Sequence, residues 1–575
     1  MRTIQTDILI LGSGGAGLFA GLHAHQAAPA LDITIAVKGL LGKCGCTRMV
    51  QGGYNVALAA GDSVERHFMD TIEGGKWLPN QDLAWKLVTL AVERIHELEN
   101  ELGCFFDRNP DGSIHQKAFA GQTFDRTVHK GDLTGIEIIN RLAEQVWAQG
   151  IHRLEEHRAV DLIPAADGQS IAGVLLIDMR SGEFVFVQAQ AVLLATGGGP
   201  TMYKYHTPSG DKSCDGLAMA LRAGLPLRDM EMVQFHPTGL LAGTHTRMTG
   251  TVLEEGLRGS GGYLLNGARE RFMPDYDPKA ERATRDVVSR SMYAEMRKGS
   301  LSPNGGLYIS MSHLNQDLVR KQFRGMVERC ADCGFDLAGG LVEVVPTAHY
   351  MMGGVEFAPD CSTGLKGLFV AGEDAGGVHG ANRLGGNGVA NSTVFGAVAG
   401  DVMAEWVGKE GSFLDVDSAS VDEAVSRCEK PFKSKSLPHG SLEPLRERLY
   451  ELMWDKVGII RDAAGLKAGL SELAALEGEL ERTGIAGADR AYNLTWHDWL
   501  NLKNLVATSR VIAQAALART DSRGAHFRED YPDAGPLENS AFTSVRQAGD
   551  RLDIAMKPVA FTRVKPGESL LARDL

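Results

Sequence analysis

The first 40 residues contain two short apolar runs separated by one longer Ala- and Leu-rich run. Residues 6–11 and 32–37 read as buried strands, because each is a short, mostly apolar stretch next to turn signals. A glycine-rich turn and an Ala- and Leu-rich stretch lie between them, and Pro29 ends that stretch. This order predicts a strand, a helix and a second strand, which together form a βαβ unit.

Two later apolar runs have the same character. Residues 189–195 run into Thr196-Gly-Gly-Gly199, and residues 367–371 run into Gly372-Glu-Asp374. Both are short apolar segments that end in a turn, which is typical of buried strands. We expect them to share one sheet with the first two strands.

The pattern changes twice further along the chain. Residues 240–349 are rich in Gly and Arg and show no strand–helix–strand rhythm, which predicts an inserted domain that can act as a lid. From residue 421 longer polar–apolar periods predict helices, chiefly over 442–460, 465–483 and 499–519. The expected organisation is a first domain made of two separated segments, an insertion, a helical domain and an irregular tail. The first domain covers 1–239 and 350–420, and the insertion covers 240–349. The helical domain covers 421–541 and the tail covers 542–575.

Composition supports a globular protein with more than one domain. The chain has 575 residues, which is more than one hydrophobic core usually supports. A net charge of -13 argues against binding to nucleic acid or to an acidic membrane surface, since both need a basic face. No stretch approaches the roughly 18 uncharged apolar residues of a membrane span. The N-terminal stretch from Met1 to Ile10 carries Arg2 and Asp7 and runs straight into a strand, so neither a span nor a signal peptide is expected.

The eight cysteines are scattered, and the only close pairs are Cys44 with Cys46 and Cys330 with Cys333. Such spacing does not form a disulfide framework, and it favours a cytoplasmic protein with reduced thiols. The alternative, half of a metal site at Cys330 and Cys333, lacks further ligands at zinc-like spacing. We therefore predict free thiols and no metal.

The glycine turn carries the first chemical signal. Gly12-x-Gly14-x-x-Gly17, with Gly15 inside it, follows a strand and opens a helix, where it can hold the pyrophosphate of a dinucleotide. Lys38 ends the second predicted strand at the place where a nicotinamide-binding protein carries an acid, which disfavours NAD. Glu373, in the turn after residues 367–371, can supply a carboxylate to a cofactor hydroxyl.

Eight further motifs occur in a fixed order. They are Cys46-Thr-Arg-Met-Val-Gln-Gly52-Gly53, Asp132-Leu-Thr-Gly135, Ala195-Thr-Gly-Gly-Gly199, Gln234-Phe-His236-Pro-Thr-Gly239, Glu254-Glu-Gly-Leu-Arg258-Gly, Thr284-Arg285-Asp286, Pro346-Thr-Ala-His349-Tyr and His379-Gly-Ala-Asn-Arg383-Leu-Gly385. With the segment from Arg519 to Pro532, they resemble the flavoprotein subunits of succinate dehydrogenases and fumarate reductases over nearly the whole chain.

The resemblance implies an α/β fold with a Rossmann-type FAD-binding domain, an inserted capping domain and a C-terminal helical domain. It also implies FAD as cofactor and hydride transfer between flavin and the C–C bond of a small (di)carboxylic acid. Together, the glycine turn and the resemblance give the expected cofactor residues: Gly12, Gly14, Gly15, Gly17, Lys38, Cys46, Thr47, Gly52, Gly53, Gly197, Asp215, Glu373, Gly388 and Val389.

By the same resemblance, His236, His349 and Arg383 hold substrate carboxylates, and Phe119 forms part of an apolar wall. A desolvated carboxylate needs such cationic or hydrogen-bonding partners. The resemblance makes Arg285 the proton donor, supplied through Glu255 and Arg258.

Two positions depart from the family pattern. Cys46 stands where covalent members attach FAD through a histidine, so we predict dissociable FAD, with attachment through the cysteine as the alternative. Loss of the covalent link favours the reductase direction, or an oxidase-like one, over succinate oxidation. Glu254 replaces a substrate-binding threonine, and its carboxylate would repel a substrate carboxylate unless it is protonated or paired. The substrate then carries an amine, or has one carboxylate near that end.

Three questions stay open at this stage. An L-aspartate oxidase is the closest enzymatic alternative, and a flavin-binding interaction subunit without catalysis is the alternative of a different class. The sequence has no haem-binding Cys-x-x-Cys-His and no iron–sulfur cysteine cluster, so electrons must come from elsewhere. The resemblance suggests an iron–sulfur partner subunit that docks on the helical domain and holds the protein at the periphery of the inner membrane, with a free-standing enzyme next.

Overall fold

A seven-stranded sheet forms the centre of the first domain in the computed structural model, which describes residues 1–434, 442–485 and 487–571. Its main order is β6-β2-β1-β9-β8-β7, and β16 pairs with β9. The strands are β1 (Arg2–Leu11), β2 (Ile33–Val37), β6 (His152–Glu155), β7 (His157–Pro164), β8 (Ile171–Asp178), β9 (Phe184–Leu194) and β16 (Leu368–Val370). Strands β2, β1, β9 and β16 run parallel to their neighbours along this series, which confirms that the four predicted strands share one sheet.

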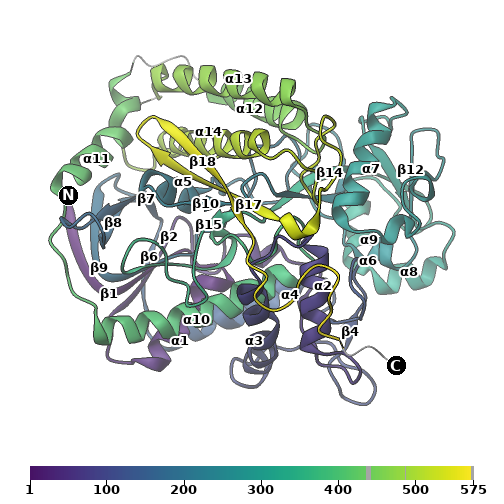
Figure 1. Ribbon diagram of the computed structural model, residues 1–575, viewed down its shortest axis with the longest axis horizontal. Coiled ribbons are helices and arrows are strands. Elements are labelled where there is room, and N and C mark those ends of the chain that lie inside the picture. Colours follow the sequence, from purple (N-terminus) through teal and green to yellow (C-terminus); the bar gives the residue numbers. More distant parts are fainter. Residues whose placement is uncertain (435–441, 486, 572–575) are drawn as a thin grey trace.

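Two helices cover one face of this sheet, α1 (Gly15–Ala27) and α10 (Asn387–Lys409) (Figure 1). They cross at close range because small residues lie at the crossing. A Cβ at Gly396 would lie 2.6 Å from the carbonyl oxygen of Ala16, so a larger residue there would push the helices apart. This packing fixes where α1 begins relative to the sheet.

A second, smaller sheet carries the inserted region. Its order is β11-β14-β13-β12, and the strands are β11 (Val233–Leu240), β12 (Tyr263–Leu265), β13 (Leu307–Ser310) and β14 (Leu341–Met351). Helices α6 (Gly256–Gly259), α7 (Arg285–Arg297), α8 (Gln316–Gln322) and α9 (Arg324–Asp332) surround it, and they form the teal region on the right of Figure 1. Residues of this region form a hydrophobic core of their own. Strands β11 and β14 run across residues 239/240 and 349/350, so the predicted boundaries, which stay predictions, fall within paired strands.

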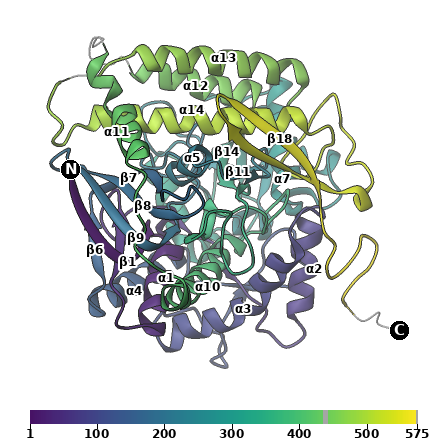
Figure 2. The ribbon, with the colours of Figure 1, turned by 60° about the vertical axis from the view of Figure 1, so that its left-hand side comes forward.

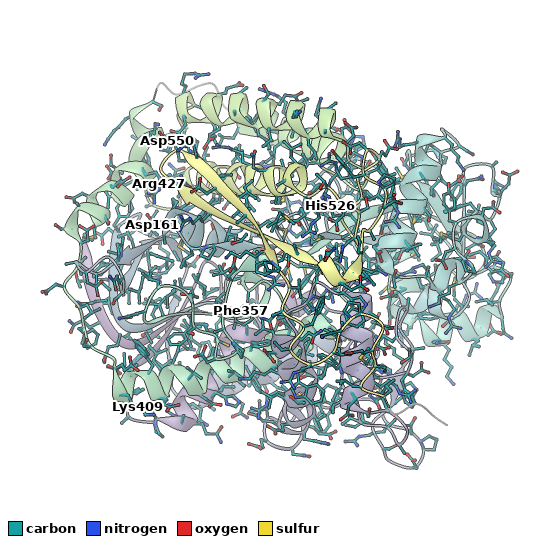
Figure 3. The ribbon with its side chains drawn as sticks, viewed as in Figure 1. Asp161, Phe357, Lys409, Arg427, His526 and Asp550 are labelled. Carbon is teal, nitrogen blue, oxygen red and sulfur yellow. The ribbon has the colours of Figure 1, made fainter. Side chains whose placement is uncertain are left out.

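Helices also form the C-terminal region, as the periodicity predicted. They are α11 (Ser418–Lys433), α12 (Leu442–Lys456), α13 (Ala463–Arg482) and α14 (Leu494–Ala518), and the last three lie side by side in both ribbon views (Figure 2). Arg427 of α11 contacts Asp161 of β7 at 2.6 Å (Figure 3). Asp161 also binds Arg222 of α5 (Asp215–Arg222) at 3.0 Å, so one carboxylate ties the helical region to the sheet.

The prediction of an irregular tail over residues 542–575 was wrong. Strands β17 (Ala541–Ala548) and β18 (Arg551–Pro558) form a hairpin, and β17 also pairs with β10 (Leu227–Arg228), which pairs with β15 (Gly354–Val355). The hairpin lacks an apolar run because β18 is largely exposed and two of the three buried residues of β17 are Thr543 and Ser544. Pairing with a strand more than 300 residues earlier holds it in place. The last four residues of the predicted tail lie outside the described residues.

The remaining elements complete the first domain. They are β3 (Tyr54–Asn55), α2 (Val64–Gly74), α3 (Gln81–Asn100), β4 (Gln116–Lys117), β5 (Thr127–Val128) and α4 (Thr134–Ala148), with short helical turns at Thr47–Met49 and Gly372–Asp374. Strands β3, β5 and β4 form a small antiparallel sheet within this domain. In the part of the chain that the structure describes, no helix combines the length and the apolar character of a membrane span.

Candidate active site

A cavity of about 570 Å³ extends from the start of α1 to the capping region, and its volume lies in the range typical of cofactor and ligand sites. Of the predicted cofactor residues, all except Gly17 line this cavity. Of the predicted substrate and catalytic residues, all except Arg258 line it. Motifs that are hundreds of residues apart in the sequence therefore face one cavity.

The glycine turn forms the cradle at one end of the cavity. Gly12 has a φ of +112°, and a Cβ there would collide with the carbonyl oxygen of Ala195. Gly17 does not face the cavity; a Cβ there would collide with the carbonyl oxygen of Gly12, so this glycine lets the helix start directly against the strand. Gly14 caps α1 without a side-chain acceptor, which leaves the start of the helix suited to an anionic group.

Lys38 stands where a nicotinamide-binding protein carries an acid, and in the structure it forms an ion pair with Asp215. Its Nζ donates to Asp215 Oδ2 at 2.9 Å, and Arg158 Nη2 donates to Asp215 Oδ1 at 2.8 Å. Burial alone would raise the pKa of Asp215, but Arg158 and Lys38 hold it well below its usual range. Asp215 is therefore an ionised acceptor at the cavity wall, suited to a cofactor hydroxyl.

Glu373 also faces the cavity. Its Oε1 accepts from the backbone N–H groups of Met351 at 2.9 Å and Gly199 at 3.3 Å. Burial raises the pKa of Glu373 to about 7. The neighbouring Asp374 instead binds Thr196 and the N–H of Gly197, at 3.0 Å and 3.1 Å, and fixes the turn that follows β9.

Cys46 lies in the cavity wall as a neutral thiol. Desolvation raises its pKa to about 12, and the nearby Glu373 carboxylate adds to this effect. The thiolate is the reactive form of cysteine, so a pKa this high makes Cys46 a poor nucleophile at neutral pH.

Arg285, at the start of α7, lies at the centre of a hydrogen-bonded series of charged groups. Its Nε and Nη2 donate to Glu255 Oε2 at 3.0 and 2.6 Å, and Arg258 Nη2 donates to Glu255 Oε1 at 3.2 Å. Burial would raise the pKa of Glu255, but Arg285 and Arg258 lower it, so this carboxylate is ionised. Arg258 lies behind Glu255, away from the cavity.

Gln234 joins Arg285 to Arg383. Its Oε1 accepts from Arg285 Nη1 and from Arg383 Nη2, both at 3.1 Å, while its Nε2 donates to the carbonyl oxygen of Arg383 at 2.7 Å. The Arg383 guanidinium also lies 4.3 Å from the centre of the Tyr350 ring. Burial, followed by repulsion from Arg285, lowers the pKa of Arg383 to about 10, so this group stays cationic at neutral pH.

The two predicted histidines lie side by side, with the centres of their rings 5.4 Å apart. His349 Nδ1 shares a hydrogen bond with Thr207 Oγ1 at 2.8 Å, and His236 Nδ1 accepts from the N–H of Thr238 at 3.3 Å. Burial and then the nearby Arg285 hold both pKa values well below the usual range of histidine. Both rings are therefore neutral hydrogen-bonding groups.

Phe119 and Glu254 line the part of the cavity beside the capping region. Glu254 is paired, because Lys117 Nζ donates to its Oε1. Burial raises the pKa of Glu254, and Lys117 opposes that rise. The sequence predicted that Glu254 would repel a substrate carboxylate unless it is protonated or paired, and the structure shows that it is paired.

Four residues of the site were not predicted. Gln234 and Tyr350 stand within motifs that marked the site in the sequence, so their positions next to His236 and His349 were a usable signal. Lys212, which lines the cavity and donates to the carbonyl oxygen of Thr196 at 2.9 Å, and Lys117 lie outside those motifs. Nothing in the sequence pattern marked those two lysines.

Comparisons with known proteins agree with this geometry. The FAD binding domain family model matches residues 7–389, and the fumarate reductase flavoprotein C-terminal model matches residues 446–570. The chain is 39% identical to one of the subunits of the fumarate reductase (CoM/CoB) of Methanothermobacter marburgensis, over 92% of this chain and 95% of the relative. It is 34% identical to the fumarate reductase flavoprotein subunit of Escherichia coli, over 92% and 89% of the two chains.

Solved structures of fumarate reductases have the same fold as this chain. The flavoprotein chain of an E. coli quinol fumarate reductase variant superposes with a TM-score of 0.92 at 32% identity, over 99% of both chains. The fold and the family models thus define an FAD-dependent oxidoreductase. Within that class, the chain belongs to the flavoprotein subunits of the fumarate reductase and succinate dehydrogenase family, which act on CH–CH bonds.

Proposed function

We propose that the protein reduces the double bond of a small unsaturated dicarboxylic acid, with fumarate as the reference substrate. The observation that supports this most is the linked set of Arg383, Gln234, Arg285 and Glu255 over one wall of the cavity. This set places two cations within a desolvated space, where a substrate carboxylate gains most from them. FAD, when bound, supplies the hydride that the double bond accepts.

Each residue then has a distinct role. Arg383 and His349 hold one carboxylate and polarise the double bond, and His236 donates from its neutral ring near the other end. Arg285 gives a proton to the alkene carbon opposite the one that receives the hydride. A guanidinium hardly deprotonates in proteins, so the step requires immediate return of a proton to Arg285. The ionised Glu255, which bonds both Arg285 and Arg258, is positioned to pass that proton.

Reoxidation of the chemically reduced flavoprotein tests this function. Under anaerobic conditions, fumarate should restore the absorbance of oxidised flavin, and one succinate should form per flavin. In a separate assay in air, which supplies the dioxygen needed for peroxide formation, L-aspartate should not reduce the oxidised protein and no hydrogen peroxide should form. Reduction by aspartate with peroxide release would identify an aspartate oxidase instead. No reaction with any unsaturated acid would point to a flavin-binding subunit without catalysis.

We expect FAD to dissociate on denaturation. Acid precipitation should leave the yellow colour and all FAD in the supernatant, because Cys46 replaces the linking histidine and its pKa near 12 keeps the thiol unreactive. Cys46→Ser should behave in the same way. A yellow pellet from the wild type that becomes colourless in Cys46→Ser would show attachment through the cysteine and contradict the expectation.

The electron donor is proposed from the relatives. The names of two of them describe subunits of fumarate reductases, one of them designated CoM/CoB. We propose that an iron–sulfur protein partner delivers electrons to the flavin for fumarate reduction. Attachment to the inner membrane through such partners belongs to the same proposal.

A further inference from the structure

The Lys117–Glu254 pair lies at the boundary between the first domain and the capping region. Lys117 belongs to the short strand β4, and Glu254 directly precedes Glu255 and helix α6. The side chain of Glu254 is 5% exposed and that of Lys117 is 19% exposed, so the pair is largely removed from solvent. Lys117 Nζ lies 5.6 Å from the centre of the Phe119 ring, which lines the cavity together with Glu254.

Neighbouring contacts join the same two regions. Gln51 Nε2 donates to the carbonyl oxygen of Val252 at 3.2 Å, and the Asp132 carboxylate packs directly against the backbone at Gly325 of the capping region. Glu254 and Lys117 therefore meet only when the capping region is seated on the first domain. The pair holds the charge of Lys117 directly behind Glu254 and Phe119, two residues that line the cavity.

Without Lys117, the Glu254 carboxylate would have no ion-pair partner at this end of the cavity. Two further carboxylates, Glu255 and Asp132, lie near enough to Glu254 to raise its pKa. Arg285 and Arg258 neutralise Glu255, whereas Lys117 is the cation that neutralises Glu254. An ammonium has three N–H groups; Glu254 Oε1 accepts from one and the carbonyl oxygen of Gly131, at 3.5 Å, from a second, so Lys117 retains one donor for another acceptor.

We infer that Lys117 determines substrate specificity by recognising the second carboxylate of a dicarboxylate, with Glu254 holding its ammonium in place. This inference rests on the proposed function, because it assumes that Arg383 holds the first carboxylate. Lys117 then supplies, at the capping end, the positive charge that the family threonine cannot. A monocarboxylic acid of the same chain length makes no use of it.

Binding to the oxidised holoprotein tests the inference without turnover. Succinate and butyrate differ by one carboxylate, and each is titrated while the flavin absorbance spectrum is recorded. In Lys117→Met the dissociation constant for succinate should rise by about 10- to 100-fold, the range of a lost charge-assisted hydrogen bond. The dissociation constant for butyrate should change less than about twofold, because butyrate has no second carboxylate for Lys117 to bind.

Three variants serve as controls. Lys130→Met removes an exposed lysine from the nearby segment and should change neither constant. Lys117→Arg keeps the charge and should retain most of the preference for succinate. Glu254→Gln keeps an acceptor for Lys117 but removes the negative charge, so succinate should bind at least as tightly as to the wild type.

The outcomes separate the two proposals. Equal weakening of succinate and butyrate in Lys117→Met would show a purely structural role, and unchanged succinate binding would show no contact; either overturns the inference. Weaker succinate binding to Glu254→Gln would also overturn it. Failure of fumarate to reoxidise the reduced wild type would instead defeat the proposed function, whatever the binding constants are.

Discussion

Replacement of Arg285 with glutamine should slow the reoxidation of the reduced flavin by fumarate by at least about 1000-fold, which is within the range of lost general acid catalysis. Glutamine keeps a hydrogen-bonding group but removes the cation and the transferable proton. It also leaves Glu255 with Arg258 as its remaining guanidinium partner. Stopped-flow absorbance of the chemically reduced variant measures the rate.

A matched control shows whether the effect belongs to this guanidinium. Arg282 is exposed and lies three residues earlier, before α7, so Arg282→Gln should react like the wild type. Both variants should retain FAD, because Arg285 belongs to the capping region and not to the glycine cradle. A rate for Arg285→Gln within tenfold of the wild type would remove Arg285 from the proton-transfer step.

Replacement of Arg383 with glutamine should lower kcat/KM for fumarate by about 100-fold, equivalent to about 3 kcal/mol, as expected when one partner of a buried charge pair is removed. Arg383 is 6% exposed and lines the cavity, so its loss removes a desolvated cation from the proposed carboxylate site. Most of the loss should appear in KM, since this residue is proposed to hold the carboxylate in the ground state as well. Steady-state kinetics with a reduced dye as donor separates the two constants.

Tyr350→Phe is the matched control for this position. It keeps the ring that lies 4.3 Å from the Arg383 guanidinium and removes only the hydroxyl group, so kcat/KM should change little. If Arg383→Gln lost less than fivefold in kcat/KM, the carboxylate would have to be held elsewhere, and the assignment of both ends of the cavity would need to be reversed.

Most of the site was predictable because its residues occur in short motifs with strong local meaning. The glycine turn has one function in a strand–turn–helix context, and residues such as Glu373 directly follow a buried strand, at the edge where ligands bind in α/β sheets. Even so, the motifs did not show which of their residues face the cavity and which lie behind its wall. Gly17 and Arg258 belong to the predicted set, yet both lie behind the cavity wall and act through Gly12 and Glu255.

The tail shows where the same reasoning failed. The hairpin of β17 and β18 has few buried apolar residues, so its sequence lacks the pattern of a strand. Its stability comes from backbone pairing with β10, and a pairing partner more than 300 residues away leaves no local signal.

The sequence alone determined the nucleotide cradle, the four parallel strands of the central sheet, the C-terminal helices and the family of the protein, because these depend on local periodicity and on motifs whose residues are close in the chain. It also identified Cys46 and Glu254 as departures. Only the tertiary structure decided that the Glu254 carboxylate is paired with a cation. Its partner Lys117 is 137 residues away, and the two meet because the capping region packs against β4. It likewise decided that Gln234 links Arg285 to Arg383, because a contact among three distant segments depends on the packing of the two domains.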